Sequence, residues 1–227
     1  MHKISAIAVA AVAGLSAVAS ADLTFQFADP VNGRQLTNTQ NNIAGPGTGQ
    51  ITYDQNAQIN FLVDGSTEPA PFAASFANAR MEMDLVIGTA VAVAPGLFSA
   101  PVSGFFRIWD FGTGQTILRG DATGGSFIRF GGTSSILFSD ITGFQYTFGA
   151  PLQALLNPGR GPINPQEGTF TITDVLTNPA GGGLIGPGGV IRSFSANSSF
   201  SGNSAVPTPG ALALMGLGGL VVGRRRR

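Results

Sequence analysis

Short apolar segments separated by turn-forming residues recur along the chain between residues 22 and 200. In the longest of them, residues 80–93, apolar and acidic positions alternate, with Met81, Met83, Leu85 and Ile87 on one side and Glu82 and Asp84 on the other. Alternation with a period of two predicts a β-strand with one buried face. Further strands are expected at residues 23–27, 50–53, 58–63, 105–110, 116–119, 126–130, 136–139, 144–148, 169–175 and 190–194, with an edge strand at 198–200.

The segments between these strands are rich in glycine, proline and asparagine, and no long stretch has helical periodicity. Residues 32–49, 150–168 and 179–189 are expected to be loops, with one helical turn around Leu152. Many short strands joined by turns predict an all-β fold. We expect a single β-sandwich domain over residues 22–200, with a jelly roll as one candidate topology, followed by a spacer at residues 201–205.

Residues 1–21 have the layout of a secretory signal peptide. Lys3 precedes an apolar run over residues 4–18, and small residues follow at positions 19–21. Signal peptidases cut after a small–x–small pattern, so Ala19 and Ala21 predict a mature protein that begins at Asp22.

The last 22 residues have three parts. They begin with a short proline-containing motif made of Val206, Pro207, Thr208, Pro209 and Gly210. An uncharged apolar segment of thirteen residues follows at 211–223, and we expect it to form a short transmembrane helix. The chain ends in a basic stop made of Arg224, Arg225, Arg226 and Arg227. Four arginines do not cross a bilayer readily, so they should hold this end on the cytoplasmic side.

This order of motif, apolar helix and arginine cluster resembles the PEP-CTERM sorting signal of exported bacterial proteins. Thr208 stands where the namesake tripeptide of that family has glutamate. The resemblance implies processing of residues 206–227 by an exosortase, a membrane protease-transpeptidase, and delivery to the cell envelope or the extracellular matrix. The partners that we expect are therefore signal peptidase and an exosortase-like enzyme, with the tail as a transient anchor in the inner membrane.

Charge and composition exclude several kinds of site from the body of the protein. Residues 22–205 hold seven basic and twelve acidic residues and no basic run, so no nucleic-acid partner is expected. The chain has no cysteine, and its single histidine, His2, lies in the signal peptide. Triads that use histidine, thiol nucleophiles and the usual zinc sites are thereby excluded from the mature body. We expect neither catalysis nor a bound cofactor.

Three candidate sites remain, all built from acidic or aromatic side chains. If Phe106 and Ile108 face the core, Phe105, Arg107 and Trp109 face outward together, and Phe127 and Arg129 are expected to join them. Aromatic rings and guanidinium groups on one face suit stacking against sugar rings, so extracellular polysaccharide is a candidate partner.

The other two candidates are alternatives to a purely structural or adhesive role. Glu82 and Asp84 share one strand face at a spacing that a glycosidase could use. Acidic residues also flank the glycine turns at residues 64–68 and 110–121, where oxygen ligands could hold calcium. The alternatives are therefore a carbohydrate-active enzyme and a calcium-dependent carbohydrate-binding module.

Overall fold

The strands in the described part of the chain belong to one antiparallel sheet. The computed structural model describes residues 20–28, 33–41, 45, 47–156 and 160–208. Within these ranges the sheet has twelve strands. They are β1 (Ser20–Phe27), β2 (Leu36–Gln40), β3 (Gly49–Tyr53), β4 (Ile59–Gly65), β5 (Phe72–Ile87), β6 (Val91–Ala94), β7 (Leu97–Asp110), β8 (Thr116–Phe130), β9 (Thr133–Ser139), β10 (Phe144–Phe148), β11 (Ile163–Thr177) and β12 (Phe194–Pro207). The prediction of an all-β fold is confirmed.

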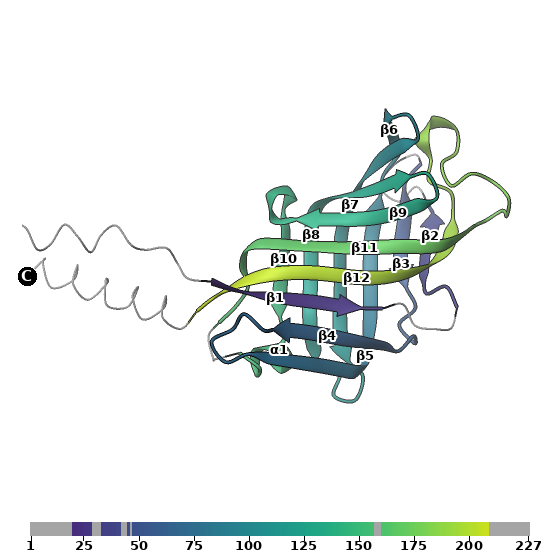
Figure 1. Cartoon of the computed structure of the whole chain (residues 1–227). Coiled ribbons are helices and arrows are strands. Elements are labelled where there is room, and N and C mark those ends of the chain that lie inside the picture. The colour runs from purple at the N-terminus through teal and green to yellow at the C-terminus, as the bar shows by residue number, and fades with distance from the viewer. Residues whose placement is uncertain (1–19, 29–32, 42–44, 46, 157–159, 209–227) are drawn as a thin grey trace, which may run out of the picture.

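Eight of these strands pair in a closed circuit. Its order is β1, β4, β5, β7, β8, β9, β11 and β12, and β12 pairs again with β1. Strands β2 and β3 form a second connection between β12 and β5, while β10 pairs with the first half of β8 and β6 with the start of β7. In Figure 1, strands β9, β11, β12, β1 and β4 run across the front, and further strands cross behind them.

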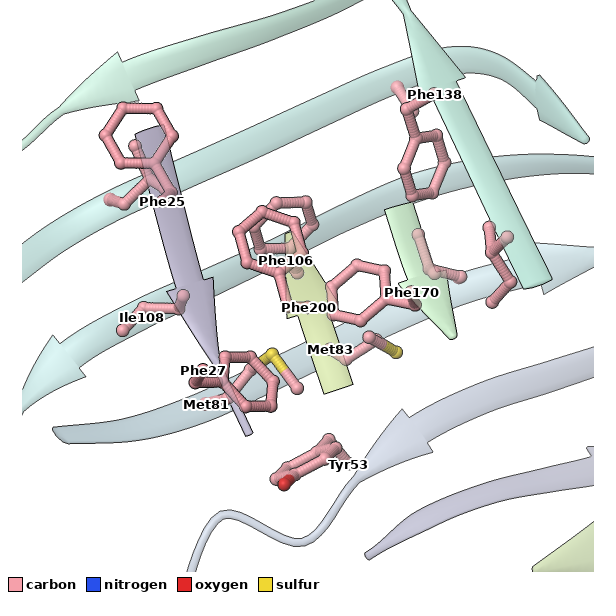
Figure 2. Packing of buried hydrophobic residues seen from close by; sticks show 14 of the residues in the cluster. Phe25, Phe27, Tyr53, Met81, Met83, Phe106, Ile108, Phe138, Phe170 and Phe200 are labelled. Carbon is pink, nitrogen blue, oxygen red and sulfur yellow. The ribbon is translucent and has the colours of Figure 1, made fainter. Parts of the chain in front are cut away.

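The core lies between these two groups of strands and is filled with aromatic rings (Figure 2). Phe106 of β7 packs edge-on against Phe170 of β11 and Phe200 of β12, with ring centroids 5.1 and 5.2 Å apart. Phe144 of β10 stacks on Phe138 of β9 at 5.2 Å. Edge-to-face and offset contacts between rings add to the gain from burying them. Phenylalanine is abundant in this chain because these rings hold the two groups of strands together.

The alternation predicted for residues 80–93 is present in β5. Met81, Met83, Leu85 and Ile87 are buried, and Glu82 and Asp84 lie on the opposite face. The strand ends at Ile87, so the expected strand over residues 80–93 is divided between β5 and the short edge strand β6. The same alternation buries Phe106 and Ile108 of β7, as predicted.

Several local predictions were wrong. Residues 150–168, expected to be a loop, include the start of β11 at Ile163, and the expected edge strand at 198–200 lies inside β12, which pairs with strands on both sides. Residues 32–49, expected to be a loop, contain β2, and residues 190–194 form only an isolated bridge, Ile185 to Ile191, before β12 begins at Phe194. The expected strands at 116–119 and 126–130 are one strand, β8, because its glycines continue the pairing with β7 rather than ending it. Residues 201–205, expected to be a spacer, lie within β12 and pair with β1 and β11.

The register of β8 also overturns the expected direction of Phe127. Between the pairs Val102–Gly125 and Gly104–Ala122, β8 has one residue more than β7. This β-bulge reverses the alternation in the second half of β8. Phe127, expected to face outward, is therefore fully buried, and Phe130 is 64% exposed.

The other elements are short helical turns, α1 (Ala150–Gln153), η1 (Asp140–Thr142) and η2 (Pro187–Gly189). Leu152 of α1 is buried, as the expected helical turn requires. No helix in the described part of the chain combines the length and the hydropathy of a transmembrane span.

Candidate functional site

The outer surface of β5, β7 and β8 carries three of the residues that the sequence predicts to face outward. Phe105, Arg107 and Trp109 alternate with the buried Phe106 and Ile108, and all three are partly exposed. Across the sheet, Phe105 pairs with Asp84 of β5 and Asp121 of β8, and Arg107 pairs with Glu82 and Arg119. Because directly opposite residues on one face lie close together, this surface combines aromatic, basic and acidic side chains.

Guanidinium groups lie over the aromatic rings of this surface. The Arg119 guanidinium carbon is 4.1 Å from the centroid of the Phe105 ring, and that of Arg107 is 5.9 Å from the Trp109 ring. Both distances are within the range of cation–π attraction.

The surface continues past the end of β7. The ring of Phe111 lies 5.8 Å from that of Trp109 and is 56% exposed, and the Arg80 guanidinium carbon is 4.8 Å from the Phe111 centroid. We call the whole surface the aromatic–arginine face; its residues are Arg80, Phe105, Arg107, Trp109, Phe111 and Arg119.

Sequence analysis missed three members of the aromatic–arginine face, namely Arg80, Phe111 and Arg119. Arg119 lies in a segment whose pairing with Phe105 depends on the register between β7 and β8, and Phe111 follows the last residue of β7. Arg80 was included in the expected strand 80–93, and its outward direction could have been predicted from the alternation with Met81 and Met83.

Acidic partners neutralise much of the positive charge on this face. Glu82 lies 3.6 Å from Arg107, and Asp121 lies 2.7 Å from Arg119. The hydrogen bond to Asp121 raises the pKa of Arg119 further above its usual value. Asp84 accepts a hydrogen bond of 2.8 Å from the Gln50 amide. The face is therefore rich in ring surface and close to neutral, and hydrogen bonds to Thr116, Gly114 and Asp121 hold the guanidinium groups of Arg107 and Arg119 in place.

The acidic residues that sequence analysis considered for calcium have protein partners. Asp64 and Asp110 accept hydrogen bonds from the backbone amides of Ser66 and Thr113 within their own turns. Glu68 is buried in an ion pair with Arg160. Among the described residues, no group of three or more acidic or histidine side chains is placed to hold a metal ion.

The two predicted processing points lie next to each other in the structure. Ser20 pairs with Pro207 and Ala21 pairs with Val206, at the end of the long β1–β12 ladder. Ala21 is 2% exposed and Val206 is fully buried, so the small side chain expected for leader cleavage packs beside the first residue of the tail motif. In Figure 1 the purple start of β1 and the yellow end of β12 meet at one edge of the molecule.

A buried ion pair and a threonine stabilise this corner of the structure. We call it the terminal junction (residues 20–22, 67–68, 160 and 206–207). Arg160 donates two hydrogen bonds to Glu68, and its Nε donates to the Pro207 carbonyl at 2.6 Å. Thr67 Oγ1 accepts a hydrogen bond from the Asp22 amide and donates one to the Asp22 carbonyl, at 2.8 and 2.9 Å. Sequence analysis missed the ion pair because 92 residues separate Glu68 from Arg160.

The remaining predicted site residues lie outside the described part of the chain. These are Ala19, Pro209, Gly210, Arg224, Arg225, Arg226 and Arg227.

A shallow hollow of about 460 Å³ lies beside β2, between the end of β11 and the start of β12. Its lining is uncharged and rich in hydroxyl groups. The fold itself uses some of these groups, because Thr177 donates to the Gly182 carbonyl and Ser193 accepts from the Gln40 amide. The aromatic–arginine face therefore remains the stronger candidate for a binding surface.

Comparison with protein-family models, with curated proteins and with solved structures gave no match for this chain.

Proposed function

We propose that this chain is an exported protein of the bacterial cell envelope or extracellular matrix that contacts polysaccharide through its aromatic–arginine face. Its role in this proposal is structural or adhesive, and no catalytic step is assigned to it. Export and sorting are inferred from the signal-peptide layout of residues 1–21 and from the resemblance of residues 206–227 to a PEP-CTERM tail.

One observation carries the glycan-binding part of the proposal. Phe105, Trp109 and Phe111 offer ring surface on one outer face, and each ring has a guanidinium group within 6 Å of its centroid. Aromatic rings that remain partly exposed stack on the apolar faces of sugars, and arginine donates hydrogen bonds in pairs. A structural role alone does not explain why the only tryptophan of the chain lies on the outer face.

At the level of fold, we propose that the closed circuit of strands corresponds to a β-sandwich whose two layers share their longest strands. The contacts between rings of β7 and β10 on one side and β9, β11 and β12 on the other support two facing layers. The jelly-roll topology has no such support and is not carried further.

Binding to purified polysaccharides tests the glycan proposal, with the exported protein and single variants on a glycan array. Trp109→Ala and Arg107→Ala should lose binding. Phe130→Ala is the matched control, because Phe130 is an exposed aromatic residue outside the aromatic–arginine face. Equal binding by wild type and Trp109→Ala would contradict the proposal.

A carbohydrate-active enzyme is the second candidate, and the position of two acids favours it. Glu82 and Asp84 lie on the same outer face and pair across the strands with Arg107 and Phe105. A sugar held on the aromatic–arginine face would therefore lie beside two carboxyl groups. Turnover of a bound polysaccharide that is lost in Glu82→Gln would favour an enzyme over an adhesive protein. Calcium-dependent binding on the same array would instead favour a calcium-dependent module.

Mass-spectrometric mapping of both termini after cell fractionation tests the sorting proposal. We expect the exported protein to begin at Asp22 and to lack the arginine cluster. An exported protein that keeps Met1, or that keeps Arg227 in the extracellular fraction, would contradict it.

A further inference from the structure

We propose that the leader must be removed before the tail can be processed, because Ser20 and Ala21 cover the first residues of the tail motif. This inference rests on the proposed sorting of the chain. It concerns the order of two cleavage reactions that act on one corner of the same molecule.

The strand pairing gives the first part of the argument. Strand β11 pairs with β12 only as far as Ala205, where its partner is Ile163. Among the described residues, the strand partners of Val206 and Pro207 are therefore Ala21 and Ser20 of β1 alone. A cut between Ala21 and Asp22 removes both partners in one step.

Burial gives the second part. Ala21 and Val206 are opposite each other in the ladder, and both side chains are buried. Proteases bind their substrates as extended segments, and they cut folded proteins mainly through transiently opened states. A segment that is already paired and buried is therefore a poor substrate until its partner leaves.

The cut would not detach the rest of β1. Thr67 Oγ1 holds both the amide and the carbonyl of Asp22, the first residue after the predicted cleavage point. Strand β1 continues from Asp22 to Phe27 along β12, with Leu23, Phe25 and Phe27 in the core. Leader removal thus uncovers Val206 and Pro207 while the fold behind them stays in place.

Arg160 then determines where the tail leaves the fold. Its hydrogen bond to the Pro207 carbonyl does not involve β1, and Glu68 keeps its guanidinium group in position. Arg160 is a positioning residue in this scheme, because after leader removal it still holds the Pro207 carbonyl.

Hydrogen exchange measures directly how far Ser20 and Ala21 protect Val206, and it needs no enzyme that processes the tail. Two forms of the protein are compared. One is the full chain of the Ala19→Leu variant, which retains its leader, and the other is the wild type after leader peptidase has removed its leader. The backbone amides of the peptide that contains Val206 should exchange at least about tenfold more slowly when Ser20 and Ala21 are present. Equal exchange in the two forms would overturn the inference.

Processing in the host tests the order of the reactions. Ala19→Leu should leave the tail uncut, whereas the double variant Ala19→Leu/Ala21→Asp should restore cutting, because a carboxylate at the buried position 21 displaces the end of β1. Ala19→Leu/Ser20→Asp is the matched control, since Ser20 is exposed, and its tail should remain uncut. Circular dichroism of each variant verifies that the domain is folded.

The outcomes separate this inference from the sorting proposal. A tail that is cut as fast in Ala19→Leu as in wild type overturns the order of reactions. An uncut tail in Ala19→Leu/Ala21→Asp also overturns it, because membrane tethering by the leader would then explain the block. If wild type itself loses the leader but never the tail, the sorting proposal fails, and the exchange measurement alone decides whether Ser20 and Ala21 cover the motif.

Discussion

Arg160 and Glu68 form a bidentate ion pair inside the protein, with nitrogen–oxygen distances of 2.6 and 2.9 Å. Each side chain is only 3% exposed. The pair joins the turn after β4 to the segment before β11 and, through Pro207, to the end of β12. Two charges removed from water in this way stabilise a structure only while both partners remain.

Removing one partner of this pair should therefore be strongly destabilising. We expect Arg160→Met or Glu68→Gln to lower the free energy of unfolding by about 3–5 kcal/mol, because the remaining group is left buried without its partner. Urea denaturation measures this change. Arg107→Ala is the control, since it breaks the more exposed pair with Glu82 and should cost only about 0–1 kcal/mol. Similar losses in Arg107→Ala and Arg160→Met would contradict the prediction.

Gly104 should not tolerate a side chain. Its φ of +131° lies in a region that residues with a Cβ rarely adopt, and a Cβ would collide with the Asp84 carbonyl oxygen of β5. We expect Gly104→Ala to lose about 1–3 kcal/mol or more of stability. Gly132→Ala is the control, because no atom lies within 4 Å of the position its Cβ would take. The thermal unfolding midpoints of the two variants measure the difference, and equal midpoints would contradict it.

Trp109 and Phe106 lie on opposite faces of β7, so their truncation should have different effects. Phe106→Ala should cost about 3–5 kcal/mol, because the buried ring contacts neighbours from four other strands. Trp109→Ala should cost clearly less, since its ring is partly exposed. A loss in Trp109→Ala as large as that in Phe106→Ala would place the indole in the core and remove the basis for glycan contact.

The effect of shortening the chain should depend on whether Val206 is kept. Deletion from Val206 onward removes a buried side chain and the Pro207 carbonyl that Arg160 contacts, so we expect a loss of about 1.5–3 kcal/mol for the valine alone. Deletion of residues 209–227 leaves both in place and should not shift the melting temperature. Circular dichroism melts of the two shortened chains provide the comparison. Equal melting temperatures would show that Val206 contributes nothing to the fold.

Stability should fall at alkaline pH because of Tyr146. Burial raises the pKa of this tyrosine well above its usual value of 10.0, and its hydroxyl donates a hydrogen bond of 2.7 Å to the Glu167 carbonyl. Below pH 10 the tyrosine is protonated in both states, so its contribution is fully present. Above that pH the unfolded chain loses the proton first, and the free energy of unfolding decreases. Tyr146→Phe should weaken this decrease in urea titrations at pH 9–11; an unchanged pH dependence would contradict the assignment.

The alternation of side chains was the most reliable guide to this fold. It correctly predicted the buried and exposed faces of β5, the inward direction of Phe106 and Ile108, and the outward direction of Trp109. These predictions succeeded because one buried face enforces a period of two over the whole length of a strand.

Features that depend on contacts between distant segments could not be predicted. A single extra residue in β8 reversed the direction of Phe127, and although Gly124 and Gly125 lie at this bulge, the glycine pair alone does not reveal the register with β7. Strand β2 is polar enough to be taken for a loop, yet β3 and β12 supply its backbone partners. The Arg160–Glu68 pair and the full extent of the aromatic–arginine face likewise depend on strand order, which composition does not reveal.

Because β1 pairs with β12, the circuit of strands is completed by the last segment of the domain to be synthesised. Pairing residues from the two ends of a long chain is slow, since most of the loop-closure entropy must be lost before these contacts form. A chain that enters a translocation channel from its N-terminus would therefore stay unfolded until nearly all of it has passed. If the chain is exported as proposed, this topology would delay folding until most of the chain has crossed the membrane.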